Sequence, residues 1–172
     1  MSAVSKSTFG LKVGALALLA AIAPATAQAA TATANLSAMA TVINNCTINT
    51  APLAFGNYDP VSANAAANLD ATGTVTIACT KGTTATIGLG LGANASGSTR
   101  RLTDGSGNYL TYEMYHEVGH TTVWGTTGAA LLSPAAAPSK AARNFTVYGT
   151  VTSNQDATAG SYTDTVVATV NF

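Results

Sequence analysis

Residues 116–120 read His-Glu-Val-Gly-His, which matches the HExxH pattern of zinc hydrolases. That chemistry needs both imidazoles on one face of a helix, one turn apart, with Glu117 as general base. The flanking sequence predicts a strand, a turn and a second strand instead. Because extended residues four apart lie about 13 Å apart along the chain, we expect a polar hairpin. A zinc hydrolase using His116 and His120 is the enzyme alternative.

No other grouping of residues has the types and spacing of a catalytic or ligand-binding site. The glycines of residues 88–92 alternate with leucines, but they lack the GxGxxG spacing and the helix that would present N–H groups to a phosphate. The seven acidic residues are scattered, and no Ser/His/Asp grouping is evident. The sequence therefore predicts no catalytic residue, no metal site and no cofactor.

The N-terminal segment has the pattern of a secretory signal peptide. Lys6 and Lys12 form a basic region, residues 13–22 form an apolar core, and small-x-small cleavage sites follow at 25–29. An apolar run of about ten residues is too short to span a bilayer. We therefore expect residues 1–29 to be a signal peptide, and we expect an exported chain with no integral membrane segment.

The remaining residues, 30–172, suffice for one domain with a modest core. Without Lys6 and Lys12, five Lys and Arg residues stand against seven Asp and Glu residues, a formal charge of −2. Only 8% of the whole chain is charged, against about a quarter in a typical domain. This surface argues against nucleic acid and anionic membranes as partners. It is typical of a protein covered by copies of itself.

Cys46 and Cys79 are the only two cysteines. In an exported chain such a pair predicts one disulfide. The alternative, a metal or redox pair, lacks the CxxC spacing that would support it.

Short β-rich stretches recur between turn residues, and no helix is predicted after the signal. The expected strands cover residues 38–48, 74–79, 84–91, 109–116, 144–151 and 161–172. The Ala-rich segments 62–67 and 129–142 are expected to be loops, each with room for a helical turn. Short strands at this spacing predict an all-β fold of the sandwich type.

The segments at both ends of the mature chain alternate between apolar and polar residues. In residues 161–172 one face carries Tyr162, Val166, Ala168, Val170 and Phe172, and this alternation runs to the last residue. In residues 30–42 the even-numbered positions are apolar and mostly small. A strand at each end, one built from small residues, suggests pairing between molecules. The alternative is that residues 30–42 are an ordinary first strand of their own domain.

Several motifs together resemble the spore coat protein U domain family, and the resemblance covers nearly all of the mature chain. The motifs are Asn-Cys-Thr-Ile at 45–48, Pro-Leu-Ala-Phe-Gly-Asn-Tyr-Asp-Pro at 52–60, Gly-Thr-Val-Thr-Ile-Ala-Cys-Thr-Lys-Gly at 73–82, Arg-Arg-Leu at 100–102, Leu-Thr-Tyr at 110–112, Thr-Val-Trp-Gly at 122–125, Tyr-Gly at 148–149 and Ala-Gly-Ser-Tyr-Thr-Asp-Thr-Val at 159–166. This family is similar to the subunits of Csu-type, archaic chaperone–usher fimbriae, and it includes secreted spore coat proteins. The histidine pair departs from the family's usual pattern.

The resemblance implies an immunoglobulin-like β-sandwich that lacks its final strand. A chaperone, and then a neighbouring subunit, would complete the sandwich by donating a strand. The donor strand would lie in residues 30–41, with Ala32, Ala34, Leu36 and Ala38 entering the groove of the neighbour. The apolar face of residues 161–172 would belong to the acceptor groove, and Cys46–Cys79 would tie the first strand to the second.

The resemblance further implies a secreted structural subunit of a surface fimbria that supports adhesion and biofilm formation, with no catalysis. The implied partners are a periplasmic chaperone, an outer-membrane usher and further pilin subunits. The implied route runs through the periplasm to the cell surface. A spore coat protein is the alternative within the structural class, and a single-domain adhesin is the alternative among binding modules.

We predict that the mature protein starts between Gln28 and Thr31 and contains the Cys46–Cys79 bond, because the signal pattern directs export and both cysteines survive cleavage. Intact-mass measurement of protein collected outside the cell checks both parts. Two free thiols in that protein would contradict the second.

Overall fold

The computed structural model describes residues 27–172 of the chain. Most of the predicted signal peptide lies outside these residues. Residues 27–39 belong to a unit separate from Ala40–Phe172, and all of them are exposed and free of secondary structure. Across the described part of the chain, no helix is both long and apolar enough to cross a bilayer.

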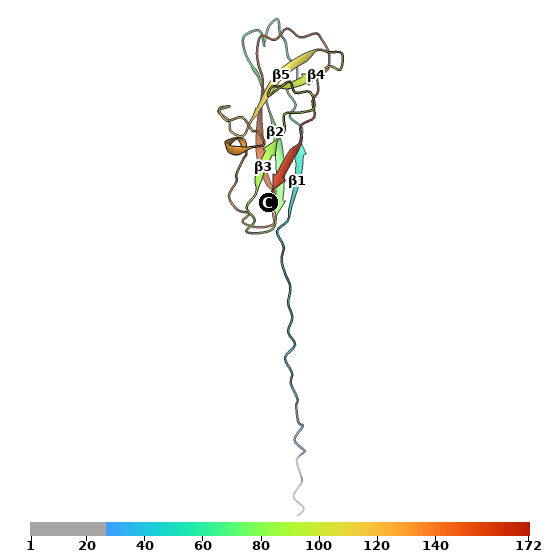
Figure 1. Cartoon of the computed structure of the whole chain (residues 1–172), viewed down its shortest axis with the longest axis vertical. Coiled ribbons are helices and arrows are strands. Elements are labelled where there is room, and N and C mark those ends of the chain that lie inside the picture. The colour runs from blue at the N-terminus through green and yellow to red at the C-terminus, as the bar shows by residue number, and fades with distance from the viewer. Residues whose placement is uncertain (1–26) are drawn as a thin grey trace, which may run out of the picture. The chain divides into compact units, whose positions relative to one another are not determined.

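The second unit is built from two antiparallel sheets (Figure 1). The larger sheet has the strand order β1-β2-β6-β5-β4, and the smaller sheet pairs β3 with β7. The bounds are β1 Cys46–Ala51, β2 Leu69–Cys79, β3 Thr86–Leu89, β4 Arg100–Thr103, β5 Tyr109–Tyr115, β6 Arg143–Val151 and β7 Ala168–Asn171, with one 3₁₀ turn, η1, at Gly128–Ala130. The all-β prediction is confirmed.

The core lies between the two sheets, and strand periodicity explains its composition. Alternate residues of β2, β5 and β6 point inward, so Val75, Ile77, Leu110 and Met114 are buried while their neighbours are more exposed. Trp124, fully buried, donates its indole N–H to the carbonyl of Ile87 at 2.9 Å. β1 and β7 run side by side at one end of this unit (Figure 1).

Four predicted strands differ from the structure by more than one residue, and one strand was missed. The strand expected over residues 84–91 forms only at Thr86–Leu89, and the strand expected over residues 74–79 already begins at Leu69. The strand expected over residues 38–48 begins only at Cys46. Residues 38–45 are exposed and lie outside any strand, although the carbonyl of Asn45 still accepts from the backbone N–H of Thr80 at 2.9 Å. In residues 161–172 a ladder forms only over β7, although Thr163 makes an isolated bridge to Thr103. Alternation shows which face a strand would bury, but the strand forms only where a partner supplies hydrogen bonds. β4 escaped prediction because it is short and carries two arginines.

Arg100 joins the two sheets from inside the core. Its side chain is fully buried. Its guanidinium donates to the carbonyls of Gly90 at 2.8 Å, Leu89 at 2.9 Å and Trp124 at 2.7 Å, and it pairs with the Glu113 carboxylate. A buried charge is tolerated only when paired and fully hydrogen-bonded, and the planar guanidinium meets several acceptors at once. The smaller sheet is thereby fixed to β4 and β5.

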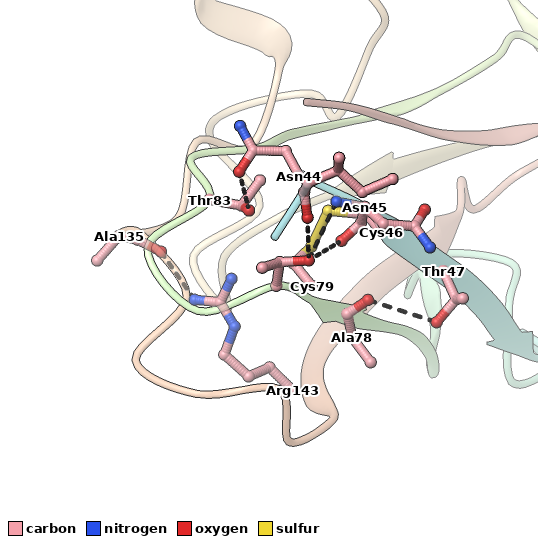
Figure 2. The surroundings of a disulfide bond; sticks show 11 residues. Asn44, Asn45, Cys46, Thr47, Ala78, Cys79, Thr83, Ala135 and Arg143 are labelled. Atoms are coloured by element: carbon pink, nitrogen blue, oxygen red, sulfur yellow. Dashed lines mark hydrogen bonds between the residues drawn. A yellow bond between two sulfur atoms is a disulfide. The ribbon is translucent and has the colours of Figure 1, made fainter. Parts of the chain in front are cut away.

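A disulfide fixes the start of the larger sheet, as the sequence predicted (Figure 2). Cys46 is the first residue of β1, Cys79 is the last residue of β2, and the two are direct partners in the antiparallel register. Beside them the Thr83 hydroxyl donates to the Asn44 side chain at 3.1 Å. The edge strand β1 is therefore held at its first residue.

The HExxH residues form a hairpin, not a helix. Tyr115 and Val123 make an antiparallel bridge across the turn. The ring of His116 meets the edge of Trp124, with ring centroids 6.2 Å apart. His120 stacks on Tyr115 at 5.0 Å and lies 2.9 Å from the hydroxyl of Thr150. The two imidazoles are therefore engaged with different neighbours.

Glu117 caps this turn and is not placed as a general base. Its carboxylate accepts hydrogen bonds from the backbone N–H of Thr122 at 2.7 Å and of Thr121 at 2.6 Å. These bonds lower the pKa of Glu117 below its ordinary value, whereas a general base works best with a pKa near the working pH. Within residues 27–172, no three His, Cys, Asp or Glu side chains gather as a metal site would require.

We expect Arg100→Met to lower the free energy of unfolding by about 3–5 kcal/mol, because Glu113 and the carbonyls lose their buried partner. Arg101→Met is the matched control. Arg101 is only half-buried, it bonds the Asn94 carbonyl and it lies over the Tyr109 ring, so its loss should cost at most about 1 kcal/mol. Denaturant unfolding of the purified mature chain measures both, and equal effects would contradict the assigned role of Arg100.

We expect the double variant His116→Ala and His120→Ala to fold, with a loss of about 1 kcal/mol from the missing Thr150 hydrogen bond. Its zinc content, measured by elemental analysis, should equal that of the unmodified protein. If the unmodified protein contains stoichiometric zinc and the double variant does not, the result would support the zinc hydrolase alternative.

Candidate functional site

Two adjoining cavities form one open groove on the second unit. The larger has a volume of about 740 Å³ and the smaller about 310 Å³. Both are lined by residues from 50–60 on one side and from 157–168 on the other, and both include Leu53, Phe55 and Asp164. We call this continuous depression the groove.

The first wall of the groove is residues 52–58, which continue the chain beyond β1. Leu53 and Phe55 are half-buried against the core, while the residues beside them are exposed. Glycines in the strands below make room for them. A Cβ atom at Gly149 would lie 2.5 Å from the Leu53 side chain and 2.9 Å from the Phe55 ring, and a Cβ atom at Gly73 would lie 3.2 Å from Leu53. The wall therefore sits close against β2 and β6.

The second wall is residues 162–168, whose backbone is paired along one edge. Thr163 exchanges two hydrogen bonds of 2.9 Å with Thr103. The carbonyls of Thr165 and Val167 accept from the N–H groups of Ala93 and Gly90, at 3.0 and 2.9 Å. These odd-numbered residues direct their backbone groups away from the first wall.

The opposite edge of the second wall is left unpaired. Successive residues of an extended chain direct their N–H and C=O groups to opposite sides, so the backbone groups of residues 162, 164 and 166 point away from the paired edge. Within residues 27–172, no backbone hydrogen bond connects residues 162–166 with residues 52–58. The groove thus combines cavities that are lined by both apolar and polar residues with a free strand edge, which is the feature that accepts an additional strand.

Asp164 is the one acidic side chain among the residues that line the groove. Its carboxylate accepts from the backbone N–H of Asn94 at 3.1 Å, from the Asn94 side-chain amide at 3.0 Å and from the Tyr112 hydroxyl at 2.8 Å. Burial and this neighbouring carboxylate raise the pKa of Tyr112 far above its ordinary value. Gly92 leaves the space that the carboxylate occupies, since a Cβ atom there would collide with it.

The residues predicted for the acceptor face fall in different places. Tyr162 lines the larger cavity, and Val166 and Ala168 line the smaller one. Val170 lines neither cavity. It lies in β7, where it pairs with Ile87 of β3, and it packs on the core. Phe172 also lines neither cavity, and 57% of its surface is exposed.

The residues predicted for the donor face, Ala32, Ala34, Leu36 and Ala38, are all exposed. The exposed fraction of Leu36 is 94%. Together with Met39, Val42 and Ile43, Leu36 makes residues 36–43 rich in large apolar side chains that are more than 70% exposed. An apolar segment of this kind is typical of a surface that binds a partner.

The first wall and Asp164 were missed as site residues by the sequence reasoning. Leu53 and Phe55 stand two apart in Pro52–Phe55, and this short alternation was the available signal. Asp164 stands near turn residues, as did the other aspartates, and nothing local distinguishes it. Its partners Asn94 and Tyr112 lie 70 and 52 residues away in the sequence.

Comparison with known proteins agrees with this architecture. The family model described as Spore Coat Protein U domain matches residues 30–169. "Protein U" of Myxococcus xanthus is 40% identical, with 93% of this chain and 94% of that protein covered.

A solved structure resembles the chain in its fold. It is the "CsuC-CsuE chaperone-tip adhesion subunit pre-assembly complex from archaic chaperone-usher Csu pili of Acinetobacter baumannii", with a TM-score of 0.55 and 22% identity over 77% of this chain. The match spans 40% of the length of that chain. The fold is accordingly an incomplete immunoglobulin-like β-sandwich, as predicted. With the family match covering nearly all of the mature sequence, this chain belongs to the spore coat protein U domain family.

Proposed function

We propose that this protein is a secreted structural subunit of a surface fimbria that polymerises by donor-strand exchange and supports adhesion and biofilm formation. The observation that carries the proposal is the groove, in which two cavities lie beside an unpaired strand edge. A free edge over an apolar depression exposes both backbone groups and apolar surface. An inserted strand would satisfy both.

The proposed occupant is residues 30–41 of a second copy of the chain. These residues alternate apolar and polar side chains, so one strand face can enter the groove while the other stays in water. Leu36, the largest side chain of the alternating apolar face, is almost fully exposed in the isolated chain. Its burial in a neighbour would contribute about 1.5–3 kcal/mol, in addition to the backbone hydrogen bonds along the edge.

A periplasmic chaperone is the proposed first occupant of the groove, and an outer-membrane usher is the proposed site of exchange. The similar solved structure is described as a complex of a chaperone with a pilus subunit before assembly, which supports the chaperone step. A protected groove matters in transit because a free edge above an apolar depression invites unspecific pairing. Export through the periplasm to the cell surface is part of the same proposal.

A spore coat protein is the second candidate, because the description of the matching family names a spore coat protein. Both candidates use the same joint between subunits. Immunogold labelling of growing and sporulating cells distinguishes them. Label on filaments of growing cells supports the fimbria, whereas label confined to the spore surface supports the coat.

We expect deletion of residues 30–37 to abolish polymerisation while leaving a subunit that its chaperone still protects, because the deletion removes the donor strand and leaves the groove intact. Electron microscopy for fibres and native gels for a polymer ladder measure the outcome. A truncated chain that still polymerises, or that unfolds as a domain missing its own first strand, would refute donor-strand exchange.

We expect Leu36→Asp and Ala34→Asp to prevent the ladder as well, since each would place an unpartnered carboxylate in the groove at a cost of several kcal/mol per joint. Thr33→Asp is the matched control, because its side chain points away from the groove in an extended strand. The same gels compare the three variants. Loss of the ladder in the control would show that charge anywhere on the segment interferes, and would undermine the assigned face.

A further inference from the structure

Asp164 is the one charged side chain among the residues that line the groove, where the proposed strand would enter. We propose that Asp164 restricts the register of the inserted strand by excluding Leu36 from the position opposite its carboxylate. This inference rests on the proposed function, with residues 30–41 of a second copy as the occupant.

The donor strand alone specifies its register weakly. A slip by two residues keeps the same face inward, and the inward face carries Ala32, Ala34, Leu36 and Ala38. Three of these side chains are identical, so several registers would offer similar alanine contacts. Leu36 alone distinguishes one register from the next.

The two cavities of the groove differ from each other, and this difference can distinguish one register from another. Asp164 lines both cavities and therefore stands at their junction, with Tyr162 in the larger cavity and Val166 in the smaller. Hydrogen bonds from Asn94 and from the Tyr112 hydroxyl hold the carboxylate in place from two other segments. The charge at the junction is therefore a fixed feature of the groove.

A leucine opposite this carboxylate would exclude its remaining water and offer no donor in exchange, which is unfavourable for a charged group. An alanine is small enough to leave the carboxylate and its hydrogen bonds undisturbed. Among the registers that remain, those that place Leu36 in a cavity next to Asp164 bury the largest side chain of the inward face. Both of its neighbours on the inward face, Ala34 and Ala38, are alanines, so the rule is met whichever way the strand runs. Fixing a register is the best-attested role of a buried polar group.

The register can be mapped by charge without altering Asp164. Lys and Glu are placed in turn at positions 34, 36 and 38 of the full mature chain, and the polymer ladder is quantified. A lysine facing Asp164 gains an ion pair, whereas a glutamate there meets a like charge. We expect position 34 or position 38, and only one of them, to give at least about tenfold more polymer with Lys than with Glu. Lys and Glu at Thr33, on the outward face, serve as the control pair and should behave alike.

Asp164→Asn, which keeps the shape and one of the two acceptor oxygens, should abolish the preference for Lys. A preference for Lys at position 36, or at none of the three positions, would overturn the register inference. The proposed function would still stand in that case, as long as the unmodified chain polymerises. Failure of the unmodified chain to polymerise, in contrast, refutes the proposed function itself.

Discussion

The buried guanidinium of Arg100 is the interaction on which the geometry of the groove depends. It is fully enclosed, and its donors meet carbonyls at the end of β3 and in the β5 hairpin as well as the Glu113 carboxylate. Those acceptors belong to both sheets, so a single side chain sets the spacing between them. Leu89 and Leu102, which flank this network, line the smaller cavity. A rigid floor of the groove at this point keeps its two walls from packing against each other.

The groove combines two features that are usually hazards for a secreted domain. An unpaired strand edge can pair with strands of unrelated chains, and a concave apolar surface can bind unrelated apolar groups. Here the edge of residues 162–166 and the side chains of Leu53 and Phe55 face the same depression. One extended segment can satisfy both at once. The disulfide joins the first residue of β1 to β2, at the end of β1 away from the first wall.

The HExxH pattern shows why a linear motif needs its structural context. The pattern prescribes zinc chemistry only on a helix, where residues four apart share a face. In this chain Gly119 and the positive φ of 51° at His120 belong to a tight turn. Glu117 consequently serves the backbone of Thr121 and Thr122. The sequence around the motif already pointed to this outcome, because strand-forming residues flank it on both sides.

The sequence by itself determined the parts of the fold that depend on short-range pattern. The central strands β2, β5 and β6 follow from alternating burial, and the disulfide follows from two cysteines in an exported chain. Only the tertiary structure decided which alternating segments are paired. Residues 30–38 alternate as clearly as β2 does, yet no segment of the described chain offers them a ladder. Likewise Asp164 acquires its position from Asn94 and Tyr112, which are remote in sequence. Hydrogen bonds between strands join segments that are distant in the sequence. Periodicity therefore predicts which face of a strand is buried, but not which other strand it pairs with.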